Sequence, residues 1–197
     1  MVHSGIVEGV LRGRELRYAV DAVVLLAGIP GAGKSTLLRR LFTGDGPVRV
    51  YDSERIRNRW MPTLGFLPYA WWRPFVHLVY YVTVLSGMRR GGGPMVVHDC
   101  ATRPWVRQLL GWRAQRAGRP VHLILLDVPG DVARDGQWAR GRVVRSGSMS
   151  THCRRWPEVL AKAADDPGYV VPGAKSALVL NRGQADHLTR ITFSGCS

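Results

Sequence analysis

Short apolar runs separated by longer amphipathic stretches form the main pattern of the chain. The runs lie at 23–27, 48–51, 95–98, 121–127 and 176–181. Each has the length of a strand, and the longer ones lack the polar alternation of a half-exposed strand, which indicates burial on both faces. We therefore predict a single α/β domain in which buried strands alternate with helices.

Periodicity and breaker residues predict where the connecting helices begin and end. The expected helices span 34–42, 53–60, 73–88, 104–117, 149–164 and 183–191. Between the second and third, residues 61–72 combine Pro62, Gly65 and Pro68 with several aromatic residues, which predicts an irregular insertion. Such an insertion forms either a substrate wall or lid, or a packed aromatic cluster. Alternation over residues 6–21 predicts an N-terminal β-hairpin.

Composition and charge restrict the classes of protein. Hydrophobic residues make up 46% and charged residues 21% of the 197 positions, which is typical of a globular domain. Without an evident bilayer span or signal peptide, we expect a cytoplasmic protein and no membrane partner. Three scattered cysteines indicate neither a disulfide framework nor a zinc site. The net charge of +14 favours phosphorylated ligands or nucleic acid, although an arginine-rich composition also follows from genomic base bias. The oligomeric state stays open.

The most specific motif follows the first apolar run. Residues 28–36 read G-I-P-G-A-G-K-S-T and match the phosphate-binding loop G-x-x-x-x-G-K-[ST] between a strand and a helix. Glycines let backbone N–H groups turn inward on an anion, Lys34 contacts the β- and γ-phosphates, and Ser35 offers a hydroxyl to Mg²⁺. We predict that the nucleotide is bound by Gly28, Pro30, Gly31, Ala32, Gly33, Lys34, Ser35 and Thr36.

A carboxylate follows the second predicted strand. Asp52 and Arg55 come directly after the run 48–51, and ligands of open α/β sheets bind at the carboxyl ends of the strands. Asp52 can accept the proton of an attacking hydroxyl, and Arg55 can hold the acceptor or a phosphate. The alternative is that Asp52 only caps the following helix.

A second carboxylate, Asp99, ends the apolar strand 95–98. This is the position at which phosphate-loop proteins hold Mg²⁺, so Ser35 and Asp99 are the predicted metal-binding residues, with helix capping as the alternative for Asp99. Thr102 and Arg103 follow closely, and we expect them to line the acceptor pocket together with Asp99.

Arginines cluster after the fourth predicted strand. Arg134, Arg140, Arg142 and Arg145 lie near the flexible sequence 146–148. Mobile arginines that close over a transferred phosphoryl group stabilise its developing charge. We predict a lid with Arg140 as a catalytic residue and Arg142 as a nucleotide contact; a solvated basic helix is the alternative. The chain then divides into a hairpin (1–22), a core (23–128), a lid region (129–165) and a last strand with a closing helix (166–197).

In this order the motifs resemble those of the small P-loop kinases grouped around polynucleotide 5′-kinase, gluconate kinase, chloramphenicol phosphotransferase and the zeta-toxin kinases. The sequence around Gly136–Arg142, with His152 and Trp156, also resembles actinobacterial AAA-family ATPases. The resemblance implies a P-loop NTPase fold with three α/β/α layers around a mainly parallel five-stranded sheet. It implies ATP and Mg²⁺ at Lys34, Ser35 and Thr36, Asp52 as the base, Arg55 as an orienting residue, and lid arginines. The lid departs from the family's usual R-x-x-x-R, because Arg134, Gly136 and Gln137 stand there.

Three functions fit these motifs. The first is a small-molecule kinase that transfers the γ-phosphoryl group of ATP, with GTP as the alternative donor, to a hydroxyl of a sugar, nucleoside or antibiotic. The second is a polynucleotide 5′-hydroxyl kinase, which the positive charge favours. The third is a non-kinase ATPase or nucleotide switch. We predict the first.

Overall fold

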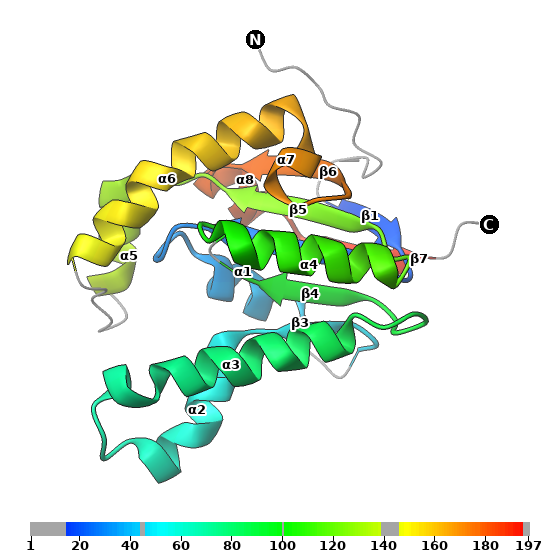
Figure 1. Ribbon diagram of the computed structural model, residues 1–197. Coiled ribbons are helices and arrows are strands. Elements are labelled where there is room, and N and C mark those ends of the chain that lie inside the picture. The colour runs from blue at the N-terminus through cyan, green and yellow to red at the C-terminus, as the bar shows by residue number, and fades with distance from the viewer. Residues whose placement is uncertain (1–14, 44–45, 100, 139–145, 195–197) are drawn as a thin grey trace.

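Five parallel strands form the central sheet of the protein (Figure 1). The computed structural model describes residues 15–43, 46–99, 101–138 and 146–194. The strand order is β3-β4-β2-β5-β6, and every neighbouring pair is parallel. The strands are β2 (Val23–Gly28), β3 (Arg49–Tyr51), β4 (Met95–His98), β5 (Val121–Leu126) and β6 (Ala174–Leu180). The predicted five-stranded parallel sheet is therefore confirmed.

Helices cover both faces of this sheet (Figure 1). One face carries α3 (Tyr69–Gly87), α4 (Pro104–Arg116) and α6 (Ser146–Asp165). The other carries α1 (Lys34–Leu41) and α8 (Arg182–His187), which are joined by hydrogen bonds from Arg40 to the carbonyls of Ala185, Asp186 and Leu188. The remaining helices are α2 (Ser53–Leu64), α5 (Gly130–Trp138) and α7 (Pro167–Val170). The three-layer P-loop NTPase fold is confirmed.

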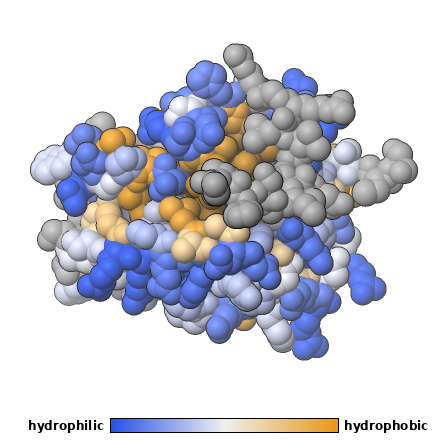
Figure 2. Space-filling view, turned by 90° about the horizontal axis from the view of Figure 1, so that it is seen from above, coloured by the Kyte–Doolittle hydropathy of each residue, from blue (hydrophilic) through white to orange (hydrophobic). Residues whose placement is uncertain are grey.

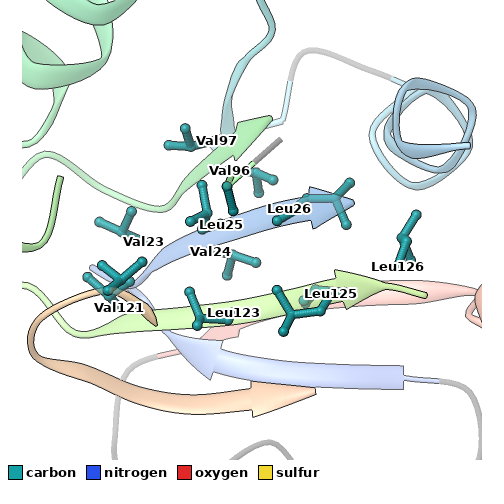
Figure 3. Packing of buried hydrophobic residues seen from close by; sticks show 14 of the residues in the cluster. Val23, Val24, Leu25, Leu26, Val96, Val97, Val121, Leu123, Leu125 and Leu126 are labelled. Carbon is teal, nitrogen blue, oxygen red and sulfur yellow. The ribbon is translucent and has the colours of Figure 1, made fainter. Parts of the chain in front are cut away.

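The core is densest around the two central strands. Every residue of β2 and β5 is buried, and their valine and leucine side chains pack together with those of β4 (Figure 3). Burial on both faces explains why these two strands read as continuous apolar runs.

On the surface of the protein seen in Figure 2, hydrophobic residues lie in the middle and hydrophilic residues around them. No helix in the described ranges is long and apolar enough to cross a membrane.

The two ends of the described chain pair with each other. Strand β1 (Glu15–Ala19) lies parallel to β7 (Arg190–Ser194) in a separate two-stranded sheet. The first arm of the predicted N-terminal hairpin lies outside the described residues, so the hairpin stays a prediction. The closing helix predicted over 183–191 is wrong in its second half, because α8 ends at His187 and β7 follows. A pairing between strands so distant in sequence leaves no local signal.

Two segments that the sequence predicts to be irregular are largely helical. The irregular insertion predicted over 61–72 is confined to residues 65–68, since α2 continues to Leu64 and α3 begins at Tyr69. Pro62 lies inside α2. Proline has no N–H to donate to the carbonyl four residues earlier, which belongs to Asn58, and Asn58 is exposed to solvent. Residues 146–148, predicted to be flexible, begin α6, which runs without interruption through Pro157.

Candidate active site

The phosphate-binding loop connects β2 to α1 at the carboxyl edge of the sheet. Gly31 and Gly33 have φ angles of 92° and 97°, in the left-handed region that favours glycine. Gly33 caps α1, so the positive end of the helix dipole lies at the loop. Lys34 is buried and its Nζ donates hydrogen bonds to the carbonyls of Gly28 (2.6 Å) and Ile29 (2.9 Å). The loop therefore presents backbone donors and a buried cation on one side, as an anion site requires.

A cavity of about 270 Å³ opens beside this loop. It brings together the loop, the ends of β3 and β4, and residues of α2, α3 and α5. The lining residues are Pro30, Gly31, Gly33, Lys34, Ser35, Asp52, Ser53, Glu54, Arg57, Tyr69, His98, Gly136 and Gln137. Of the predicted nucleotide-binding residues, Ala32 and Thr36 instead line a small crevice between α1 and α8.

Asp52 lies at the junction of β3 and α2 and has two polar partners. Its Oδ1 accepts a hydrogen bond from the Glu54 amide (2.9 Å), so the helix-capping alternative is confirmed. The same oxygen lies 2.8 Å from Nδ1 of His98, the last residue of β4. Within the described chain, Oδ2 has no hydrogen-bond partner. Capping therefore uses one carboxylate oxygen and leaves the other for a ligand.

The surroundings of Asp52 keep its carboxylate ionised. Burial by itself would raise the pKa of Asp52, but the hydrogen bond and charge of His98, the Glu54 amide and the charge of Arg55 outweigh it. The net result is a pKa below the ordinary value of 3.8. A negative charge at neutral pH thus lines the same cavity as Lys34.

Arg57 and Tyr69 form a wall of the cavity. Tyr69 belongs to the stretch 61–72, for which the sequence offered a substrate wall as one alternative, whereas Arg57 was not predicted. The guanidinium of Arg57 lies over the Tyr69 ring, 4.6 Å from its centroid. Its Nε is buried and has no hydrogen-bond partner within the described residues. Arg55, the arginine that the sequence singled out, is exposed and does not line the cavity. The helical position that reaches the cavity is two residues farther along α2.

Helix α5 packs directly on the phosphate-binding loop. Gln137 is buried, and its Nε2 donates to the carbonyl of Pro30 over 3.0 Å. A Cβ on Gly136 would lie 2.8 Å from the carbonyl oxygen of Gly31. Gly136 and Gln137 thus occupy the positions where the resemblance led us to expect a lid arginine. At Gly136, α5 lies too close to the loop for a larger side chain. Arg140 and Arg142 lie outside the described residues.

Three other residues predicted to bind the acceptor, Asp99, Thr102 and Arg103, do not line this cavity. Asp99 accepts a hydrogen bond from the Ala101 amide (3.0 Å) and one from the Tyr81 hydroxyl (3.4 Å). Thr102 is buried, with its Oγ1 2.8 Å from Nδ1 of His152 on α6. Arg103 is half-buried, and its charge contributes to lowering the pKa of both His77 and His152. None of the three lines the cavity beside the loop.

His152 joins this edge of the site from α6. Burial lowers its pKa, and the charges of Lys34, Arg103 and Arg155 lower it further, while Asp99 opposes them. The charge of Lys34 thus acts on His152, which lies on the side of the site formed by α6. In the sequence His152 was noted only through a resemblance, because no local pattern indicates that it meets Thr102, 50 residues earlier.

A phosphate-binding loop at the carboxyl edge of a five-stranded parallel sheet, with a strand-end carboxylate in the same cavity, defines a P-loop NTPase fold. The sequence model of the family described as AAA domain matches residues 23–156. The chain therefore belongs to this AAA-domain family. Comparison with curated proteins finds no match.

Solved structures share the fold at low sequence identity. A candidate kinase of Chloroflexus aurantiacus is 17% identical with a TM-score of 0.57, and the match covers 82% of this chain and 88% of that one. A protein of the PezAT chromosomal toxin–antitoxin system of Streptococcus pneumoniae is 14% identical with a TM-score of 0.59, covering 88% and 72%. Shikimate kinase of Bacteroides thetaiotaomicron is 15% identical with a TM-score of 0.50, covering 85% and 94%. At these identities the likeness concerns the fold.

Proposed function

We propose that the protein is an ATP-dependent kinase that transfers the γ-phosphoryl group to a hydroxyl of a small molecule such as a sugar, nucleoside or antibiotic-like compound. One observation carries this proposal: Lys34, Ser35 and the carboxylate of Asp52 line a single cavity. Phosphate-binding groups and a proton acceptor are thereby close enough to act on one substrate pair. The kinases among the structural relatives support the same reaction class.

The loop side of the cavity would bind the triphosphate. The amides around Gly31 and Gly33 and the ammonium of Lys34 are suited to the β- and γ-phosphates. The donor set fits magnesium, since the Ser35 hydroxyl lines the same cavity and Mg²⁺ binds through one or two protein oxygens plus phosphate and water. Magnesium bound there would supply positive charge to the phosphate oxygens. Asp99 stays a second candidate ligand.

Asp52 would accept the proton of the acceptor hydroxyl at Oδ2. Its Oδ1 is held by the Glu54 amide and His98, which fixes the plane of the carboxylate. A low pKa makes Asp52 a weak base, but phosphoryl transfer depends mainly on positioning and electrostatic stabilisation, with little need for early proton removal. An ionised, oriented carboxylate therefore suits the reaction.

The acceptor would lie between Asp52 and the wall formed by Arg57 and Tyr69. The buried Nε of Arg57 has no hydrogen-bond partner in the described part of the chain, and the Tyr69 ring gives an apolar surface to an organic acceptor. Arg103 would extend this side, with Arg55 at its exposed margin, whereas Thr102 lies on the side toward α6 and is joined to His152. Arg140 and Arg142 would close over the transferred phosphoryl group as lid arginines, and GTP is the alternative donor.

The proposal is tested by measuring ADP release with Mg²⁺-ATP and a panel of hydroxyl compounds. Removing a positioned general base typically costs 10²–10⁴-fold in rate, so Asp52→Asn should lose at least about 100-fold of acceptor-dependent turnover. Asp166→Asn is the matched control, because Asp166 caps α7 through the Gly168 amide as Asp52 caps α2. Full acceptor-dependent turnover in Asp52→Asn would refute the base assignment.

The panel also separates the alternatives. An oligonucleotide with a free 5′ hydroxyl is included because the net charge of +14 favours polyanions. Phosphorylation of this oligonucleotide alone would replace the small-molecule assignment with a polynucleotide kinase. Hydrolysis that no acceptor accelerates, and that persists in Asp52→Asn, would indicate a nucleotide switch.

A further inference from the structure

A second cavity, of about 440 Å³, lies between α4 on one side and α6 and α7 on the other. It shares no lining residue with the cavity beside the phosphate-binding loop. Its lining residues are Thr102, Pro104, Arg107, Gln108, Arg155, Glu158, Val159, Lys162, Gly168, Tyr169, Val170 and Pro172. The volume lies within the range of small-molecule sites.

Arg107 of α4 is the unusual residue of this cavity. Its exposed fraction is only 7%, yet Nε and Nη1 are buried without a hydrogen-bond partner within the described chain. Burial lowers the pKa of Arg107, and the charges of Glu158 and Asp99 offset this only in part. Leaving buried guanidinium donors unpaired is unfavourable. A ligand that accepts from them would remove this cost.

The charges around Arg107 favour an anion. Three of the lining residues are cationic, Arg107, Arg155 and Lys162, and only Glu158 is anionic. Glu158 is paired with Lys162 at 2.7 Å, and Arg155 has a long hydrogen bond from Nη1 to the Thr102 carbonyl (3.4 Å). Two guanidinium groups thus remain for a ligand, and guanidinium binds carboxylate and phosphate through paired hydrogen bonds.

The rest of the wall is apolar. The cavity is also lined by Pro104, Val159, Val170 and Pro172. Tyr169, which is 66% exposed, lines it as well. A bare inorganic ion would leave these surfaces in water. A ligand with an anionic group and an apolar or aromatic body would cover them and bind more tightly.

We propose that the cavity between α4 and α6–α7 is a binding site for a small organic anion, a carboxylate or a phosphate monoester with a ring or short apolar body. Arg107 and Arg155 bind the anionic group, and Tyr169, Val159 and Pro172 contact the body. The site is separate from the proposed phosphoryl-transfer cavity, and the proposal does not depend on the kinase activity.

Isothermal titration calorimetry with phenyl phosphate and with benzoate tests this site. Both titrations are made on Lys34→Ala protein, which removes the ammonium that would bind anions at the phosphate-binding loop. Arg155→Gln removes a cation that lines the cavity and is exposed on α6. The matched control is Arg154→Gln, because Arg154 is the neighbouring exposed arginine and does not line the cavity. Thermal melts verify that each variant folds.

We expect at least one probe to bind Lys34→Ala protein at millimolar concentration or tighter. Affinity should fall about tenfold or more in Arg155→Gln, as loss of a charge-assisted hydrogen bond implies, and stay within about twofold in Arg154→Gln. Arg107→Gln should abolish binding if it folds. Binding of phenyl phosphate alone assigns a phosphate monoester, and binding of benzoate assigns a carboxylate. Absence of binding by either probe, or equal loss in Arg154→Gln and Arg155→Gln, would overturn the proposal.

Discussion

Replacing Gly136 by alanine tests the packing of α5 on the phosphate-binding loop. The added Cβ would lie 2.8 Å from the Gly31 carbonyl oxygen, closer than a carbon and a backbone oxygen can pack. Overpacking costs about 1–3 kcal/mol, whereas alanine in place of a helical glycine gains at most about 1 kcal/mol. We expect a net loss of roughly 1–2 kcal/mol, which lowers Tm by about 2 to 8 °C for a chain of this size.

The substitution should also weaken nucleotide binding. Gly31 belongs to the loop, so displacing its carbonyl would shift the amides that are proposed to bind the phosphates. The assays are urea unfolding and calorimetric titration with ATP. The control is Gly147→Ala on α6, where no atom lies within 4 Å of the added Cβ, so stability should stay unchanged or rise by up to about 1 kcal/mol. If Gly136→Ala were as stable as Gly147→Ala and bound ATP normally, the contact between α5 and the loop would be wrong.

Two further predictions concern the same cavity. Because the pKa of Asp52 is lower in the folded than in the unfolded state, its contribution to stability is present above pH 3.8 and lost as the pH falls through the lowered value. Urea midpoints measured from neutral pH to about pH 2 should therefore fall less steeply in Asp52→Asn; identical profiles would contradict the ionised pair with His98. Gln137→Leu removes the donor to the Pro30 carbonyl and should destabilise the protein by about 1 kcal/mol in urea unfolding; a neutral effect would argue against this bond.

The sequence alone determined the central sheet and the phosphate-binding loop. Strands β2 and β5 were recognisable because both faces are buried, so nearly every position is apolar, with His122 of β5 as a buried polar exception. The loop was recognisable because close approach of backbone to phosphate requires glycines at fixed spacing before Lys34. Asp52 was expected at the carboxyl edge because a strand of a parallel sheet delivers the residue that follows it there, and it lines the cavity beside the loop; its role stays a proposal.

Tertiary structure alone decided which partners meet. The contact of His98 with Asp52 joins two adjacent strands, and that of His152 with Thr102 joins α6 to the start of α4. Arg57 rather than Arg55 lines the cavity because of the rotation of α2 about its axis. The pairing of β1 with β7 depends on contacts between segments that are distant in the sequence. Local propensity and motif spacing act over a few residues, whereas these contacts are fixed by how whole elements pack. The cavity between α4 and α6–α7 has the same origin, because its arginines share no motif.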